Sequence, residues 1–215
     1  MLGQFTAKTH NCAVGISLQQ FNQLQNRVGG TGRKERADQD PVKRPAKPVA
    51  RVILGVDPSL RGTGYGVIRV AKPFPETLAH GTVTCPADWE HSRCLVKTTQ
   101  TLRELIREHQ PTICIIEGLF FAQNLKTALI MGEARGAALA VIAEAGLEIY
   151  EVAPRKVKQA IVGYGAAQKI AVAKMVQRML QLAELPAPDA ADALALALTH
   201  SLENSAYAFS DPKRV

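Results

Sequence analysis

Two short apolar runs, each ending on an acidic residue, constrain the fold of this chain more than any other feature. Residues 52–56 (Val-Ile-Leu-Gly-Val) lead directly into Asp57, and residues 113–116 (Ile-Cys-Ile-Ile) lead directly into Glu117. Uninterrupted apolar runs of this length are typical of buried strands. If the two strands are parallel neighbours, their ends lie about 5 Å apart. Both carboxylates are then expected at one edge of a sheet.

The rest of the chain from about Val49 alternates strand and helix patterns. Residues 65–70, 77–84 and 147–152 predict further strands, and the glycine-rich stretch 58–64 predicts a turn. The predicted helices cover 90–109, 123–145, a short stretch from Pro154, 166–182 and 188–203. The first three strands are expected to form an antiparallel meander. This order predicts an α/β fold in which a mixed sheet carries helices on both faces.

Charge and composition divide the chain into three parts. Residues 1–51 carry nine Lys and Arg against three Asp and Glu, whereas residues 52–215 carry seventeen against sixteen. We expect a disordered basic extension over 1–48, one domain over 49–204 and a tail over 205–215. The extension is alternatively a start-site artefact. No segment resembles a signal peptide or a membrane span, and the four cysteines show no metal-ligand spacing, so we expect a cytoplasmic protein.

Positive charge gathers in one part of the predicted domain. Between Val152 and Ala183 there are six cations and no acid: Arg155, Lys156, Lys158, Lys169, Lys174 and Arg178. Such segregation favours a polyanionic partner. The alternative is a solvated helix face without a partner.

Two more acids complete a candidate metal site. Asp189 and Asp192 lie three residues apart at the start of the last predicted helix, which places them on one face. Together with Asp57 and Glu117 they form an all-oxygen set, which suits Mg²⁺. Two such ions would activate water and stabilise the leaving oxygen of a phosphodiester. Asp57 is alternatively a turn residue and Asp189 a helix cap, whereas Glu117 and Asp192 lie in apolar stretches where an unpaired acid is costly.

At these residues the chain resembles the RuvC family of Holliday-junction resolvases, in the ribonuclease H/retroviral integrase superfamily. The resemblance spans about Arg51 to Ser201 and rests on four segments in order: ILGVDPSLRGTGYGVI (53–68), IIEGLFFAQNLKTALIMGEARG (115–136), APRKVKQAIVGYGAAQKIAVAKMV (153–176) and DAADALALALTH (189–200). It implies a ribonuclease H-like mixed five-stranded sheet. The chain departs from the family pattern at Ser59, where glycine is usual, and at Gly118, where a polar residue is common.

The resemblance also implies roles for individual residues. It assigns catalysis and metal binding to Asp57, Glu117, Asp189 and Asp192. It also implies two bound Mg²⁺ ions, for which Mn²⁺ can substitute. It places phosphate contacts at Lys158 and Lys169 and an aromatic contact near the junction centre at Phe120. Arg155 and Lys174 are added as DNA contacts because they belong to the same basic segment. Phe121 is either a second stacking residue or a loop core residue.

The implied activity is that of a homodimer that makes paired, symmetric nicks in four-way DNA junctions during recombination and repair. The products carry 5′-phosphate and 3′-hydroxyl ends, and the implied partner is the RuvAB branch-migration complex. Gly132 and Gly136 mark either the dimer face or helix–sheet packing. Two other functions stay open: a junction-binding protein without activity, and a related nuclease for other branched or RNA-containing substrates.

Overall fold

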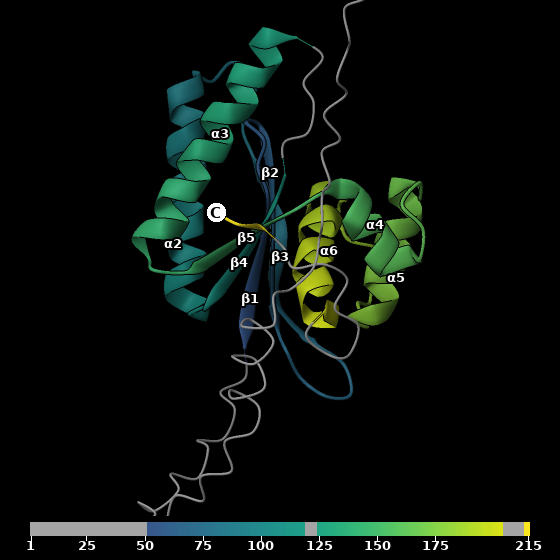
Figure 1. Cartoon of the computed structure of the whole chain (residues 1–215). Coiled ribbons are helices and arrows are strands. Elements are labelled where there is room, and N and C mark those ends of the chain that lie inside the picture. Colours follow the sequence, from purple (N-terminus) through teal and green to yellow (C-terminus); the bar gives the residue numbers. More distant parts are fainter. Residues whose placement is uncertain (1–50, 119–123, 204–212) are drawn as a thin grey trace, which may run out of the picture. The chain divides into compact units, whose positions relative to one another are not determined.

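The computed structural model describes residues 51–118, 124–203 and 213–215, and it is built around one mixed β-sheet (Figure 1). The strands are β1 (Val52–Asp57), β2 (Gly62–Arg69), β3 (Glu76–Thr84), β4 (Ile113–Glu117), β5 (Glu148–Val152) and β6 (Lys213–Arg214). They lie in the order β3-β2-β1-β4-β5-β6. The predicted meander of β1 to β3 and the parallel β1, β4 and β5 are both confirmed. The two-residue β6, which falls in the expected tail, adds antiparallel to β5.

Helices cover both faces of the sheet, as predicted (Figure 1). Helices α2 (His91–His109) and α3 (Leu125–Glu144) lie on one face, and α4 (Pro154–Val162), α5 (Lys169–Met179) and α6 (Pro188–Glu203) lie on the other. Helix α5 is shorter than the predicted 166–182, because the backbone at Gln181 turns into the left-handed region with a φ of 53°. In the described parts of the chain, no helix combines the length and apolar character that a membrane span requires.

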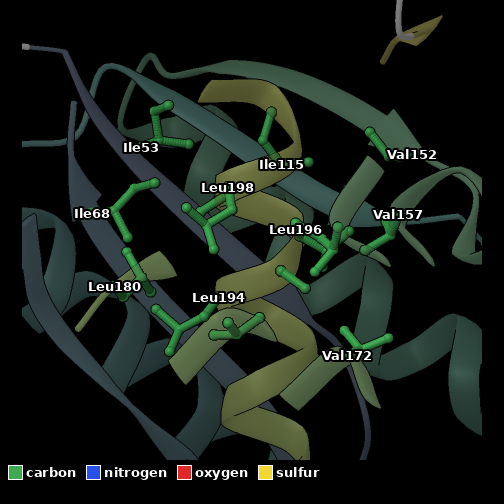
Figure 2. Close-up of a cluster of buried hydrophobic side chains, with 14 of the residues drawn as sticks. Ile53, Ile68, Ile115, Val152, Val157, Val172, Leu180, Leu194, Leu196 and Leu198 are labelled. Atoms are coloured by element: carbon green, nitrogen blue, oxygen red, sulfur yellow. The ribbon is translucent and has the colours of Figure 1, made fainter. Parts of the chain in front are cut away.

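Strand alternation divides the core into two clusters. On β4, Ile113 and Ile115 pack toward α6, whereas Cys114 and Ile116 pack toward α2 and α3. Figure 2 shows the α6 cluster, in which Leu194, Leu196 and Leu198 meet aliphatic side chains of the sheet, α4 and α5. Helix α6 is buried along most of its length, so its acids are positioned by a rigid core element.

The predicted turn over 58–64 is wrong in its second half. Residues 62–64 already belong to β2: Gly64 pairs with Asp57 on β1, and Gly62 pairs with Thr84 on β3. Glycine is needed there because α6 crosses the strand in direct backbone contact. A Cβ at Gly64 would lie 2.0 Å from the carbonyl oxygen of Asp189. These glycines indicate close helix–strand packing, although glycine in this pattern ordinarily signals a turn.

Candidate active site

Asp57 and Glu117 project from the same face of the sheet because of the strand period of two. Ile53, Gly55 and Asp57 share one face of β1, and Ile113, Ile115 and Glu117 share the same face of β4. The parallel pairing runs through Val56 and Ile116, so the two acids follow directly on adjacent strands. The side chain of Glu117 hydrogen-bonds that of Asp57. The sequence-based prediction that these acids meet at one sheet edge is therefore confirmed.

Helix α6 brings the other two acids to this edge over a platform of glycines. A Cβ at Gly55 would lie 2.0 Å from the carbonyl oxygen of Ala193, and one at Gly66 would lie 2.7 Å from the side chain of Leu194. The helix can approach the strands this closely only because glycine lacks a side chain. The Asp189 carboxylate lies over β2, with Oδ2 only 3.0 Å from the Cβ position at Gly62. Asp192 follows one turn later.

Asp192 is held by a cation from α5. The ammonium Nζ of Lys169 donates to Oδ2 of Asp192 at 2.6 Å. Asp192 is 22% exposed at its side chain, whereas Lys169 is 73% exposed. The hydrogen bond to Asp192 is the main cause of the raised pKa of Lys169. Lys169 is the first residue of α5, so the start of this helix is tied to the acid site.

The crowding of acids changes the protonation of Asp57. Burial raises the pKa of Asp57 to about 8, and the charge of Glu117, the hydrogen bond to Glu117 and the charge of Asp192 act in the same direction. The charge of Lys169 opposes them. Near neutral pH, Asp57 therefore keeps its proton. This is the response expected of adjacent carboxyls when one positive charge does not balance them.

The four acids are thus gathered but are not arranged around a single point. In the ranges that the structure describes, no three His, Cys, Asp or Glu side chains converge as the ligands of one ion. Asp57 and Glu117 contact each other, Asp192 is paired with Lys169, and Asp189 lies over the glycines of β2. The all-oxygen donor set fits a hard divalent cation such as Mg²⁺. Binding one requires Asp57 to lose its proton and Lys169 to release Asp192.

A cleft of about 110 Å³ adjoins these groups. Its polar lining consists of Glu117, Lys158, Lys169 and Asp192, and its apolar lining consists of Pro154, Val157, Val172 and Leu196. The two lysines that sequence similarity assigns to phosphate contacts therefore share one cleft with two of the acids. A cleft lined by both carboxylates and ammonium groups suits a phosphodiester beside a cation.

The other predicted DNA contacts are less closely grouped. Arg155 is exposed and its side chain packs over Gly165, where a Cβ would lie 2.5 Å from Cγ of the arginine. Lys174 lines a separate hollow of about 480 Å³ on α5 with Gln177 and Arg178. Phe120 and Phe121 lie outside the described residues. The roles of all these side chains in DNA binding remain predictions.

His200 does not belong to the acid site. It is buried and its ring stacks on Tyr150, with centroids 5.3 Å apart. It lines a hollow with Arg51 and Thr112, at the amino-terminal ends of β1 and β4. The acids lie at the carboxyl ends of the same strands, so His200 and the acid site are at opposite edges of the sheet.

The two departures from the family pattern are accommodated by backbone hydrogen bonds. The backbone N–H of Ser59 donates to Oγ1 of Thr63 at 3.2 Å, and this hydroxyl donates to the carbonyl of Ser59 at 2.5 Å. The turn after Asp57 is therefore closed without the side chain of Ser59, which is exposed. The N–H of Gly118 donates to the carbonyl of Val152 at 2.9 Å, which ties the end of β4 to β5.

Arg135 was missed by the sequence analysis. Its guanidinium donates to the backbone carbonyl oxygen of Glu117 and to the carboxylate of Glu151. The residue is buried, with 8% of its surface exposed. The available signal was an arginine among small and apolar residues of a predicted helix, since a buried cation requires partners.

Comparisons with known proteins find relatives of one family. The family model described as crossover junction endodeoxyribonuclease RuvC matches residues 53–200, which include all four acids. A RuvC from Chromohalobacter salexigens is 44% identical over 152 residues, 71% of this chain and 81% of its own. A RuvC from Rubrobacter xylanophilus is 41% identical over 155 residues, 72% and 87% of the two chains. The structure of T. thermophilus RuvC in complex with a Holliday junction substrate has a TM-score of 0.70 at 32% identity and covers 77% of this chain and 99% of that one.

Proposed function

The chain belongs to the RuvC family of crossover junction endodeoxyribonucleases, and we propose that its acid site cleaves four-way DNA junctions with the help of bound Mg²⁺. The observation that carries this proposal is that Asp57 lies beside Glu117, Asp192 and Lys169, the last three of which line one cleft. Once Asp57 has lost its proton, three carboxylates surround Lys169, and a divalent cation would balance the negative excess.

The residues that would hold Mg²⁺ are Asp57, Glu117, Asp189 and Asp192, with Mn²⁺ as a substitute. When bound, two such ions activate a water molecule and stabilise the leaving oxygen of an in-line displacement. Asp57 gives up its proton before it can act as a ligand. The rigid packing of α6 on the glycines of β1 and β2 keeps Asp189 and Asp192 at this edge. The expected products carry 5′-phosphate and 3′-hydroxyl ends.

Lysines of α4 and α5 position the DNA backbone. Lys169 is mostly exposed, and its ammonium group is bound to Asp192. When a cation replaces the ammonium group at Asp192, the lysine side chain would be free to turn toward a phosphate. Lys158 lines the same cleft from α4. Their ammonium groups would hold the scissile strand beside the acids by charge attraction, which carries no sequence preference. Arg155 and Lys174 would extend this contact along the duplex.

Helix α3 offers a face for a second copy of the chain. Leu125 and Leu129 are 76% and 60% exposed, and Cβ atoms at Gly132 and Gly136 would meet nothing within 4 Å. These four positions lie on one side of α3 by the helical period. The two glycines therefore do not serve helix–sheet packing, which was the alternative to a dimer face. We propose that this stripe contributes to a homodimer, which matches the twofold symmetry available in a four-way junction.

Cellular context completes the proposal. The described cysteines are free thiols, which supports a role in the reducing cytoplasm. There the enzyme would act with the RuvAB branch-migration complex in recombination and repair.

Cleavage of synthetic DNA by wild-type protein and Asp57→Asn tests this function. We expect Mg²⁺-dependent, symmetric nicks in a mobile four-way junction by the wild type. Asp57→Asn should lose cleavage but keep junction binding, because it removes one ligand without disturbing the basic surface. Linear duplex and RNA–DNA hybrid serve as comparison substrates. Equal cleavage of either one would favour the related-nuclease alternative, and an inactive wild type that binds junctions would favour the noncatalytic one.

A further inference from the structure

A buried cation lies behind the acid site, on the opposite face of the sheet. Arg135 comes from α3, with its side chain 10% exposed. It donates one guanidinium nitrogen, Nη1, to the carbonyl oxygen of Glu117 and the other, Nη2, to the carboxylate of Glu151. Buried arginines require this kind of compensation. Both partners lie at the end of the sheet where the acids gather.

The strand geometry explains why Arg135 reaches the backbone of Glu117 and not its carboxylate. The side chain of Glu117 projects toward α6, on the same face as Ile115. Glu151 projects to the opposite face, as Ile149 does in the cluster with α3. Arg135 therefore holds the peptide group of Glu117 from behind while the carboxylate points to the cleft.

The backbone around Glu117 is fixed from two directions. The N–H of Gly118 donates to the carbonyl of Val152 on β5 at 2.9 Å. The carbonyl oxygen of Glu117 accepts from Arg135 on α3. These two bonds orient the peptide group between residues 117 and 118, and this orientation in turn sets the direction of the Cα–Cβ bond of Glu117. Glu151 orients the guanidinium and neutralises its charge.

We propose that Arg135 is a positioning residue for cation binding. Through the carbonyl of Glu117 it holds that carboxylate toward the cleft where a divalent ion would bind, and Glu151 keeps the arginine in place. The inference rests on the proposed function, which makes Glu117 a metal ligand. It adds that cation binding also depends on a residue on the opposite face of the sheet. Arginine suits this role better than lysine, because a planar guanidinium can bridge a carbonyl and a carboxylate at fixed angles.

Titration of Mn²⁺ into the DNA-free protein tests the inference, with free Mn²⁺ followed by electron paramagnetic resonance. The variants are Arg135→Lys, which keeps the charge but loses the fork, and Glu151→Gln, which keeps the shape but loses the partner charge. We expect each to weaken Mn²⁺ binding by about tenfold or more, the usual effect of groups that orient metal ligands. Cleavage should then require correspondingly more metal, with junction binding unchanged.

Arg103→Lys is the matched control. Arg103 on α2 pairs with Glu144 of α3 at 3.2 Å, on the same face of the sheet but without contact to Glu117. This variant should bind Mn²⁺ as the wild type does. A purely structural role of Arg135 would lower the melting temperature without changing the metal affinity of the folded protein.

The possible outcomes distinguish a failure of this inference from a failure of the proposed function. If Arg135→Lys and Glu151→Gln both bind Mn²⁺ as tightly as the wild type, the positioning role is overturned and the proposed function stands. If Arg135→Lys fails to fold, Glu151→Gln decides alone. If Asp57→Asn binds Mn²⁺ as tightly as the wild type does, both the proposed metal site and this inference are overturned.

Discussion

The two faces of the sheet differ in how closely their helices approach. On the α6 face, β1 and β2 present Gly55, Gly64 and Gly66, and the helix backbone rests directly on the strands. On the α2 and α3 face, the strands present branched side chains such as Val56 and Ile116, and the helices pack at ordinary side-chain distance. The acid site lies on the closer face. Direct backbone contact places α6 with little freedom, which is what ligands on three different elements require.

The chemistry is divided between the faces in the same way. The acids and Lys169 lie on the α6 side, and the two lysines of the cleft come from helices on that side. The α2 and α3 side contributes Arg135, which acts on the backbone of β4, and the exposed stripe of α3. One face therefore carries the groups that we propose to react, and the other carries Arg135 and the α3 stripe that we propose for a partner subunit.

The largest loss of stability is expected from adding a side chain to a strand glycine that α6 contacts. Gly64→Ala places a Cβ 2.0 Å from the carbonyl oxygen of Asp189, so α6 must shift or the protein must unfold. We expect a loss of about 3 kcal/mol or more in the free energy of unfolding, because the clash is with backbone. Cleavage should be abolished. Chemical denaturation and junction cleavage measure the two effects.

Gly136→Ala is the control for that substitution. A Cβ there meets nothing within 4 Å in the same chain, so in dilute solution the change should leave the stability of the single subunit unchanged or raise it by up to about 1 kcal/mol. Equal destabilisation by the two alanines would show that the faces do not differ in helix approach.

The pH dependence of stability is the second expected effect. The pKa of Asp57 is raised from 3.8 to about 8 in the metal-free protein, so the folded state keeps a proton that the unfolded state releases within this window. The free energy of unfolding should therefore fall as the pH rises from about 4 to about 8 and then level off. Asp57→Asn should remove this fall and be more stable than the wild type at pH 8.

Denaturation in a chelating buffer at several pH values measures this slope. Glu104→Gln, at an exposed position on α2, should keep the wild-type slope.

Binding of Mg²⁺ near neutral pH should release protons, which calorimetry in buffers of different ionisation enthalpy detects. Metal binding without proton release would contradict the protonated state of Asp57.

A smaller effect should distinguish the faces at neighbouring positions on one strand. Ile115 and Ile116 are both fully buried but point toward α6 and toward α2 and α3, respectively. Replacing either with valine should cost about 1 kcal/mol of stability. Only Ile115→Val is expected to weaken Mn²⁺ binding, because Ile115 lies two residues before Glu117 on the same face. Equal Mn²⁺ affinity in the two variants would show that packing beside Glu117 on the α6 face does not affect metal binding.

The smallest effects should come from the lysines of the cleft. Lys158→Ala and Lys169→Ala should each weaken junction binding and reduce its salt dependence by about one phosphate contact. Lys174 lines a separate hollow, so its replacement should change the salt slope less. Arg103→Ala, on the opposite face, should leave it unchanged. Fluorescence anisotropy at several salt concentrations measures all four, and an unchanged slope for Lys158→Ala would remove that residue from the DNA surface.

The sequence alone determined the elements, their order and the choice of acids. Apolar runs of four or five residues predicted β1 and β4, and the helical period predicted helices where α2, α3, α4, α5 and α6 lie. Asp57 and Glu117 stood out because each directly follows such a run. These features depend on periodicities of two and 3.6 residues, which are local and therefore visible in one chain.

Only the tertiary structure decided which of these groups contact each other. The pairing of Lys169 with Asp192, the hydrogen bond of Asp57 with Glu117 and the hydrogen bond of Arg135 with Glu117 join residues from 18 to 60 positions apart. Gly62 and Gly64 of β2 were assigned to a turn because their partner, α6, follows more than a hundred residues later. Contacts of this kind depend on how closely helices pack on the sheet, and no local pattern records that distance.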